Sequence, residues 1–343
     1  FLKEELGLSV VVNPEQSAAS EISRLMRFVP AIKAEPFAKG RIDLVEFKVK
    51  ENSPLDGVQL SDFYRQFKVK ILVCAARRGE EVFIPKGNFI IRSGDKLTIL
   101  AAPAEISNFF RTVGTFQRKV RDVMVVGGGR IAYYLARQLI ETGIHVKIIE
   151  KDEKRCNQLF DLLPKATILH GDGTDHHLLE SEGIFHCDAF IALTDRDEEN
   201  LLMALTAKRY GVKKVVPKMS RLGYLDIVSL TGLDSVVSPK AIVAGQISSY
   251  VRGLANSQGS AVESLHYILG GAMEAVEFTA TNATHFLDRP LSDLHFRKGL
   301  LVAAIVHDGK MVIPNGHSKI HAGDRVIVMA KELFLQDLND ILG

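Results

Sequence analysis

The chain of 343 residues contains an internal duplication, and this duplication limits the architectures open to it more than any other feature. Residues 7–27 and 232–252 align at one constant offset. In each copy a short apolar stretch leads into a proline, which is expected to start a helix because proline suits a first helical turn. The matched pairs include Gly7 with Gly232, Pro14 with Pro239, Ile22 with Ile247 and Arg27 with Arg252.

A second pair of segments repeats in the same order along the chain. In both copies a Gly-Asp pair, ending in Asp95 or Asp324, separates alternating apolar runs, and this pattern predicts a hairpin turn. The matched stretches are 45–47 with 276–278 and 84–100 with 313–329. The chain therefore carries two copies of a small strand-rich module, which we place at residues 37–118 and 262–343.

Residues 119–236 occur only once, and they begin with a strand, a glycine-rich turn and a helix. The strand is expected over 121–126 and the helix over 131–143, and the next strand ends at Glu150. A first glycine permits the tight turn, a later one lets backbone approach a pyrophosphate, and the helix N-terminus offers free N–H groups to phosphate. The turn consists of Gly127, Gly128, Gly129, Arg130, Ile131 and Ala132. We therefore predict nucleotide binding; the alternative is a glycine turn that only packs.

The remaining residues of this segment alternate between predicted strands and helices. Ligands in open parallel sheets gather at the carboxyl ends of the strands. Further polar residues at such ends are Asp172, Thr194, Asp195 and Lys218. The predicted fold class is α/β: a Rossmann-like doubly wound parallel sheet, flanked by two small α+β modules, with one adenine-nucleotide cleft.

Glu150 is expected to select the nucleotide, since its carboxylate can accept both ribose hydroxyls of the adenosine. A 2′-phosphate would face this carboxylate, and such like-charge contact costs several kcal/mol. NAD(H) or another adenine nucleotide is therefore favoured over NADP(H), although Lys151, Lys154 and Arg155 weaken that exclusion.

Composition and charge argue against several classes of protein. The 43 basic and 41 acidic side chains give a formal net charge of +2, unlike a dedicated nucleic-acid binder. No apolar run approaches the roughly 20 residues of a spanning helix. Cys74, Cys156 and Cys187 lie far apart, so neither a disulfide framework nor a structural zinc site is expected, and a reducing cytoplasm fits best.

No group of residues indicates catalysis or a metal site. Hydride transfer needs a group that moves a proton and a substrate pocket, and a duplicated module is a poor source of either. We interpret Cys187 as a buried thiol and the polar group His170, Asp172, Asp175, His176 and His177 as loop and helix-start residues. The histidines after residue 236 are scattered without ligand spacing: His266, His285, His295, His307, His317 and His321. We therefore predict a ligand sensor without catalytic or metal-binding residues, and not an enzyme.

Several motifs carry a resemblance to a known family. The stretches are VMVVGGGRIAYYLA (123–136), IIEKDEKRC (148–156), HGDGTD (170–175), FIALTDRDEENLLMALTAKRYGVKKVV (190–216) and the two Gly-Asp modules. The chain resembles the RCK (KTN) family, which pairs nucleotide-binding RCK-N domains with RCK-C modules. The resemblance implies that residues 1–36 are the last strand and crossover helix of a truncated first RCK-N domain. It further implies a first RCK-C module (37–118), a second RCK-N domain (119–236), a crossover helix with linker (237–261) and a second RCK-C module (262–343).

The resemblance also implies a role. It implies a peripheral, cytoplasmic subunit on the inner face of the cell membrane, which assembles beneath a Trk-type potassium channel and controls its gate through bound NAD(H), ATP or ADP. By position, Gly127 to Ile131 match the phosphate loop, Glu150 the ribose acid, Asp172 the Gly-Asp loop, and Thr194 with Asp195 the adenosine pocket. Lys218 stands near the phosphates, where relatives often have arginine. This departure and Ala132 leave the choice between ATP and NADH open.

Control of a gate favours a homo-oligomeric ring, because several sites can share the required selectivity for one gate state. Helices expected over 14–28 and 239–253 are candidate interfaces between neighbouring nucleotide domains; the alternative is packing within one chain. Two other functions stay open at this point: an NAD-dependent oxidoreductase, and the cytoplasmic regulatory tail of a potassium/proton antiporter.

Overall fold

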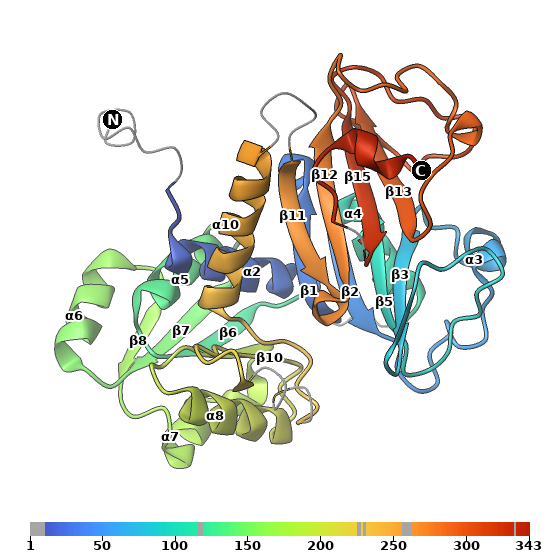
Figure 1. The fold of residues 1–343 in the computed structure, drawn as a ribbon. Helices are drawn as coiled ribbons and strands as arrows, with labels where there is room; N and C mark the ends of the chain where they lie inside the picture. The colour runs from blue at the N-terminus through green and yellow to red at the C-terminus, as the bar shows by residue number, and fades with distance from the viewer. Residues whose placement is uncertain (1–10, 115–118, 225–227, 229–230, 256–261, 333) are drawn as a thin grey trace, which may run out of the picture. The chain divides into compact units, whose positions relative to one another are not determined.

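The computed structural model describes residues 11–114, 119–224, 228, 231–255, 262–332 and 334–343. It consists of two compact units (Figure 1). The first unit combines Phe1–Ile32 with Gln117–Val243, and the second combines Lys33–Phe116 with Ala244–Gly343. Each unit is therefore built from two segments that lie far apart in the sequence.

The first unit contains a five-stranded, wholly parallel sheet in the order β10-β9-β6-β7-β8. The first strand in sequence lies in the middle, and the chain winds first to one side and then to the other, as in a doubly wound fold. The strands are β6 (Asp122–Val126), β7 (His145–Glu150), β8 (Thr167–His170), β9 (Ala189–Ala192) and β10 (Lys214–Pro217). The helices between them are α5 (Arg130–Glu141), α6 (Glu153–Leu162), α7 (His176–Ser181) and α8 (Asp197–Arg209). The predicted Rossmann-like sheet is confirmed.

Helix α2 (Pro14–Arg27), from the start of the chain, packs against α5 in this unit. It begins where sequence predicts, with Pro14 in the first turn and the side chain of Asn13 accepting a hydrogen bond from the Gln16 N–H at 3.0 Å. Its apolar face is buried through Ala18, Ala19, Ile22, Leu25 and Met26. The sequence left two roles open for this helix, an interface between neighbouring copies and packing within one chain. Packing within one chain accounts for the face of α2 that contacts α5.

The second unit contains two antiparallel sheets with the same strand order, β1-β2-β5-β3-β4 and β11-β12-β15-β13-β14. We call these sheets, with their helices, the first and the second module. The first has β1 (Ala31–Phe37), β2 (Ile42–Lys48), β3 (Leu72–Arg78), β4 (Glu81–Phe83), β5 (Lys96–Ala101), α3 (Leu60–Phe67) and α4 (Pro103–Thr112). The second has β11 (Val262–Ile268), β12 (Met273–Thr279), β13 (Leu300–His307), β14 (Lys310–Val312) and β15 (Arg325–Lys331). The duplicated sequence therefore folds as a duplicated structure.

The two modules share one hydrophobic core. Residues of both sheets contribute to it, among them Phe37, Leu44, Leu269 and Met329. At equivalent positions, each module has a buried carboxylate that accepts a hydrogen bond from the backbone of the other module. Glu46 of β2 accepts from the Leu269 N–H at 3.0 Å, and Glu277 of β12 accepts from the Ala38 N–H at 3.1 Å. The modules thus pair with each other through the same elements.

The predicted Gly-Asp hairpins are wrong. Gly94 and Gly323 have positive φ and lie in turns, as expected. The residues before each turn do not form a strand, however; they make an isolated bridge in the first module and no described bridge in the second. The strand after each turn pairs instead with two other strands of its sheet. The hairpins lie instead at β3–β4 and β13–β14. The turns of the two copies share one shape because the carboxylates of Asp95 and Asp324 each accept a hydrogen bond from the backbone N–H three residues upstream.

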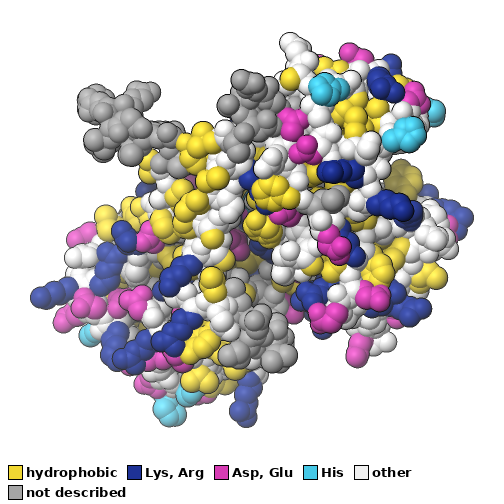
Figure 2. Space-filling view, in the orientation of Figure 1, with side chains coloured by type: hydrophobic (Ala, Val, Ile, Leu, Met, Phe, Trp, Pro, Cys, Tyr) yellow, Lys and Arg dark blue, Asp and Glu magenta, His cyan; other side chains and the backbone are white. Residues whose placement is uncertain are grey.

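Helix α10 (Pro239–Ala255) begins at the second duplicated proline. Unlike α2, it has a single buried residue, Arg252, over 239–254, where burial is described, and its apolar Ile247, Val251 and Leu254 are each about half exposed. Figure 2 shows hydrophobic side chains, in yellow, at the surface where Figure 1 places this helix. Among the described residues, no helix has both the length and the apolar character that a membrane span requires.

Candidate nucleotide-binding site

The glycine turn lies where the winding of the sheet reverses. Gly127 follows β6 with φ of +94°, and its N–H donates to the Ile149 carbonyl at 2.9 Å. A Cβ on Gly127 would lie 2.9 Å from the Leu193 carbonyl carbon, in the segment that follows β9. Only glycine fits both the backbone angle and this close approach. The turn therefore lies between β6 and β9, the position at which open α/β sheets bind ligands.

Glu150 is tied to the glycine turn by its carboxylate. One oxygen accepts from the Gly128 N–H at 2.6 Å and the other from the Asp152 N–H at 2.8 Å. A Cβ on Gly128 would approach the Glu150 carboxylate oxygen to 3.0 Å and Leu159 to 2.5 Å. Each carboxylate oxygen can accept a second bond. Glu150 is thus oriented by the backbone while it keeps acceptor capacity for hydroxyl groups.

The N-terminus of α5 faces this turn. Gly129 is its N-cap and makes no side-chain capping bond, and a Cβ there would meet nothing within 4 Å. The first N–H groups of a helix have no partner inside the helix, and they carry partial positive charge. Arg130 lies in this first turn, and its guanidinium pairs with Glu15 of α2. Donors for an anion and an arginine therefore lie together at the turn.

Asp172 and Lys151 form an ion pair beside Glu150. Lys151 Nζ lies 2.6 Å from Asp172 Oδ2, and the other oxygen accepts from the Thr174 N–H and hydroxyl at 3.0 and 2.7 Å. The hydrogen bond from Lys151, followed by those from Thr174, lowers the pKa of Asp172 to about 2. Asp172 is therefore ionised at neutral pH, and the Lys151 charge is balanced.

Thr194 and Lys218 are brought together by Asn200, which sequence reasoning missed. Its fully buried side-chain oxygen accepts from the Thr194 N–H and hydroxyl at 2.9 and 2.8 Å. Its side-chain nitrogen donates to the carbonyls of Thr194 and Lys218. Asp195 points to solvent, with one oxygen 3.4 Å from the Lys218 amine. The segments after β9 and β10 are thus joined through one amide.

Sequence reasoning named Arg155 only as a charge near a 2′-phosphate and missed its contact with the glycine turn, and it missed Glu15 altogether. Arg155 Nε donates to the Gly128 carbonyl at 2.7 Å, and Glu15 reaches Arg130 from a helix more than a hundred residues upstream. A basic residue in the first turn after Glu150 was a signal for the former. No local signal points to the latter, because only the packing of α2 on α5 brings it there. The predicted residues Gly127 to Ile131, Glu150, Asp172, Thr194, Asp195 and Lys218 all lie at the carboxyl edge of the sheet.

Among the other polar candidates, Asp175 has a structural role and Cys187 carries a thiol of low reactivity. Asp175 caps α7, accepting from the His177 N–H at 2.9 Å. Burial raises the pKa of the Cys187 thiol to about 12, so the reactive thiolate is scarce at neutral pH. No group of three or more His, Cys, Asp or Glu in the described part of the chain has metal-binding geometry.

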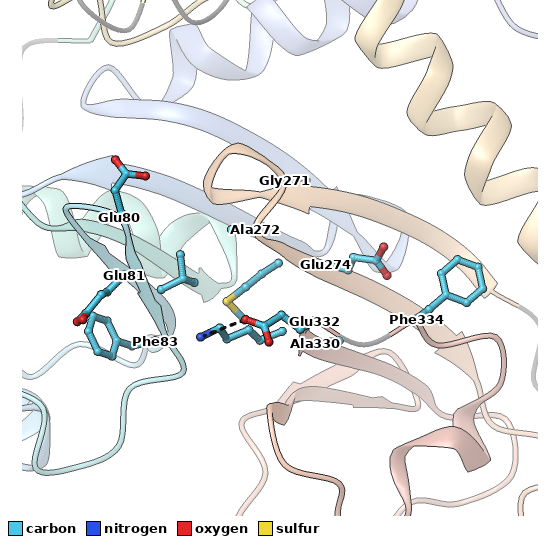
Figure 3. Close-up of a pocket in the computed structure, with 12 residues that line it drawn as sticks. Glu80, Glu81, Phe83, Gly271, Ala272, Glu274, Ala330, Glu332 and Phe334 are labelled. Carbon is cyan, nitrogen blue, oxygen red and sulfur yellow. Dashed lines mark ion pairs between the residues drawn. The ribbon is translucent and has the colours of Figure 1, made fainter.

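A separate open groove of about 910 Å³ lies in the second unit (Figure 3). It runs between the β3–β4 hairpin of the first module and the ends of β12 and β15 of the second. Glu80, Glu81, Glu274 and Glu332 line it with the rings of Phe83 and Phe334. Three of the four carboxylates already pair with Arg77, Arg252 and Lys331. The groove has none of the glycine-turn geometry of the first unit.

Comparisons with known proteins agree with this division. Residues 123–239 match the TrkA-N domain, and residues 44–114 and 275–343 match the TrkA-C domain. The Trk system potassium uptake protein TrkA homolog 2 of Methanosarcina mazei is 32% identical over 332 residues, covering 96% of this chain and 72% of that protein. TrkA of Halomonas elongata is also 32% identical over 332 residues, covering 96% and 71%.

Solved structures share the fold at low sequence identity. The GsuK RCK domain has a TM-score of 0.54 and 16% identity, covering 96% of this chain and 70% of that chain. The structure described as the GsuK channel bound to NAD has a TM-score of 0.50 and 15% identity, covering 90% and 55%.

Proposed function

Because this chain belongs to the TrkA family of Trk system potassium uptake proteins, we propose that it is a cytoplasmic, nucleotide-sensing regulatory subunit. Its partner in this proposal is a Trk-type membrane potassium channel, and it acts from the inner face of the cell membrane. The domain boundaries given above and the ten predicted site residues belong to the same proposal.

One observation carries the nucleotide site: Glu150 is held by the Gly128 N–H beside an uncapped helix N-terminus. The helix N-terminus suits a pyrophosphate, and Glu150 suits the hydroxyls of a ribose. Arg130 lies in the same first turn, where Glu15 pairs with its guanidinium. Thr194 and Asp195 would border the adenosine, and Lys218 would add positive charge near the phosphates. NAD(H) fits this arrangement, and ATP or ADP would use the same adenosine contacts.

The site favours a ribose over a 2′-phosphate. The carboxylate of Glu150 would repel a phosphate on that hydroxyl. From the sequence, Lys151 could have offset this repulsion by pairing with the 2′-phosphate. In the structure this lysine pairs with Asp172 instead. Arg155 is likewise directed to the Gly128 carbonyl and to Gln158. The expected preference for NADH over NADPH is therefore stronger than the run of basic residues alone suggests.

Control of a channel gate sets a requirement on affinity. Moving a gate from 1:99 to 99:1 takes about 5.5 kcal/mol of differential binding. About four coupled sites in a ring could supply this with about tenfold selectivity each, since tenfold corresponds to about 1.4 kcal/mol. The exposed apolar side chains of α10, Ile247, Val251 and Leu254, offer a surface for such an assembly. Sedimentation showing monomer alone at micromolar concentration would contradict the ring.

Calorimetric titration with NADH, NAD, ADP, ATP and NADPH tests the site. NADH or ATP is expected to bind and NADPH to bind weakly. Glu150→Ala should weaken binding by at least about tenfold, because it removes both the ribose acceptor and the support of Gly128. Glu141→Ala, an exposed acid at the other end of α5, is the matched control and should bind as the unaltered chain does. Failure of every nucleotide to bind would refute the site, and turnover of NADH would refute the sensor role.

A further inference from the structure

A buried lysine lies at the end of β10 opposite to the nucleotide site. Lys214 begins β10 and is 3% exposed. Its amine donates to the Ala31 carbonyl and to the Ser235 hydroxyl, the latter at 2.8 Å. The Ser235 hydroxyl, 1% exposed, lies 3.2 Å from the carbonyls of both Ala31 and Ile32 and can donate to either. We call these four residues the Lys214 junction.

The junction joins both chain segments that leave the nucleotide-binding fold. Ala31 and Ile32 follow α2; they are the last residues of the first unit's leading segment and also the first two residues of β1, the strand that begins the first module. Ser235 precedes α10, which leads to the second module. The segment around Ser235 also lies along the outer edge of β10, where the Val237 N–H donates to Pro217 and the Met219 N–H to Val237. One strand therefore contacts both exits.

The same strand ends in the candidate nucleotide site. Lys218 follows β10 directly; its N–H donates to Ala192 at 2.8 Å and its carbonyl accepts from Asn200. Four residue steps separate Lys214 from Lys218, about 13 Å of extended backbone. A paired strand of this length transmits a displacement of one end to the other because it cannot shorten without breaking its ladder bonds.

Burying the amine of Lys214 costs free energy, because the charged form loses its hydration. Burial lowers the pKa of Lys214 to about 7, with the charge of Asp234 opposing the shift. An apolar side chain would avoid this desolvation, but it would not hold the two exits together. Above its pKa the amine keeps two N–H donors, which is the number that the Ala31 carbonyl and Ser235 hydroxyl accept. The junction therefore stays formed in both protonation states.

We propose that Lys214 is a positioning residue that couples the nucleotide site to both segments leaving the nucleotide-binding fold. The inference rests on the proposed function for its ligand, but the junction itself does not. A nucleotide bound beside Lys218 and Thr194 shifts or stiffens β10. Through the hydrogen bonds of Lys214, the same change reaches Ala31, Ile32 and Ser235.

Hydrogen exchange of peptides containing Ile32 and Val237, measured with and without NADH and with ADP, tests the coupling. Lys214→Met keeps the length of the side chain and removes its donors. Lys208→Met is the matched control, because Lys208 is an exposed lysine of the same fold that donates to the Gly232 carbonyl. Ser235→Ala is a second junction variant that serves if Lys214→Met does not fold.

In the unaltered chain and in Lys208→Met, NADH is expected to slow exchange in both peptides. Lys214→Met and Ser235→Ala are expected to bind NADH within about twofold of the normal Kd yet to lose that response. A response that persists in these variants would overturn the coupling. Without nucleotide, Lys214→Met should already speed exchange of both peptides by about tenfold. No such change would overturn the junction, whereas absence of binding to the unaltered chain would overturn the proposed function alone.

Discussion

The two copies of the duplicated sequence fold alike but do not use their equivalent residues alike. Each module holds a buried aspartate after its Gly-Asp turn, Asp95 at 1% and Asp324 at 2% exposure. Arg78 contacts Asp95 through two nitrogens at 2.8 Å, whereas His307 contacts Asp324 through one at 2.6 Å. Arg78 and His307 are the last residues of the equivalent strands β3 and β13.

This difference separates a permanent ion pair from one that depends on pH. Arginine stays charged at all physiological pH values, while histidine titrates near neutrality. The helices that enter the copies differ too: α2 buries six residues, whereas the described side chains of α10, at 239–254, include one buried residue, Arg252. A duplicated fold can therefore keep its backbone while one copy gains a titratable contact and an uncovered helix face.

The largest expected effect concerns the equivalent isoleucines of the two helices. Ile22 is fully buried, so Ile22→Ala should lower the free energy of unfolding of the first unit by roughly 2–5 kcal/mol. Ile247 belongs to the second unit and is 49% exposed, so Ile247→Ala should change the free energy of unfolding of that unit by less than about 0.5 kcal/mol. Urea unfolding followed by exchange of α5 peptides for the first unit and of β11 peptides for the second measures the two changes. Equal losses would show that α10 is covered in solution as α2 is.

The next effect concerns the ion pairs of the modules. Asp95→Ala should cost about 3 kcal/mol, at the low end for buried pairs because the Arg78 side chain is 34% exposed. Asp324→Ala should cost less, since His307 can lose its proton when its partner is removed. Urea unfolding monitored in each module gives the two values. A larger loss for Asp324→Ala would reverse our ranking of the pairs.

A smaller effect is expected for the carboxylates exchanged between the modules. Glu277 also accepts a hydrogen bond from the Ser264 hydroxyl at 2.8 Å and pairs with Arg325 at 2.7 Å. Among the described residues, Glu46 has the Leu269 N–H as its side-chain partner and no equivalent of these two contacts. Glu277→Gln should therefore cost about 2 kcal/mol and Glu46→Gln about 1 kcal/mol. Thermal unfolding of both variants measures the difference, and equal costs would mean that the shared Ala38 and Leu269 contacts dominate.

The smallest effect is a dependence of stability on pH. The hydrogen bond to Asp324, with its charge, raises the pKa of His307 above its ordinary value. Asp308 adds to this shift, and the His321–Asp288 pair faces the same ring. Because the folded pKa is raised, the stabilisation is complete below about pH 6.5 and is lost as pH rises through the folded pKa.

Hydrogen exchange of β13 and β15 across this pH range checks the prediction. His307→Arg, which recreates the pair of the first module, should abolish the dependence, and the exposed His317→Ala should leave it unchanged. A dependence that survives in His307→Arg would assign it to another group.

Much of the fold was readable from the chain because its signals are local. The strand predicted at HVKIIE is β7 residue for residue, since its β-branched Val146, Ile148 and Ile149 favour a strand and are all buried. Gly127 and Glu150 were found because their backbone geometry and spacing define the turn. The hairpin expected at Asp95 failed because its turn leads into a strand that pairs with β2 and β3 instead. Local residues specify a turn, but not which strands meet after it.

Local pattern was therefore enough for the repeat, the order of elements, the glycine turn and the position of Glu150 beside it. Long-range packing was needed to bring Glu15 to Arg130, Asn200 between Thr194 and Lys218, and Lys214 to Ala31. Buried polar groups must find partners wherever folding places them, and those partners lie up to 239 residues away, as between Ala38 and Glu277. Periodicity and spacing record neighbours along the chain, so contacts of this kind become visible only when the chain is packed.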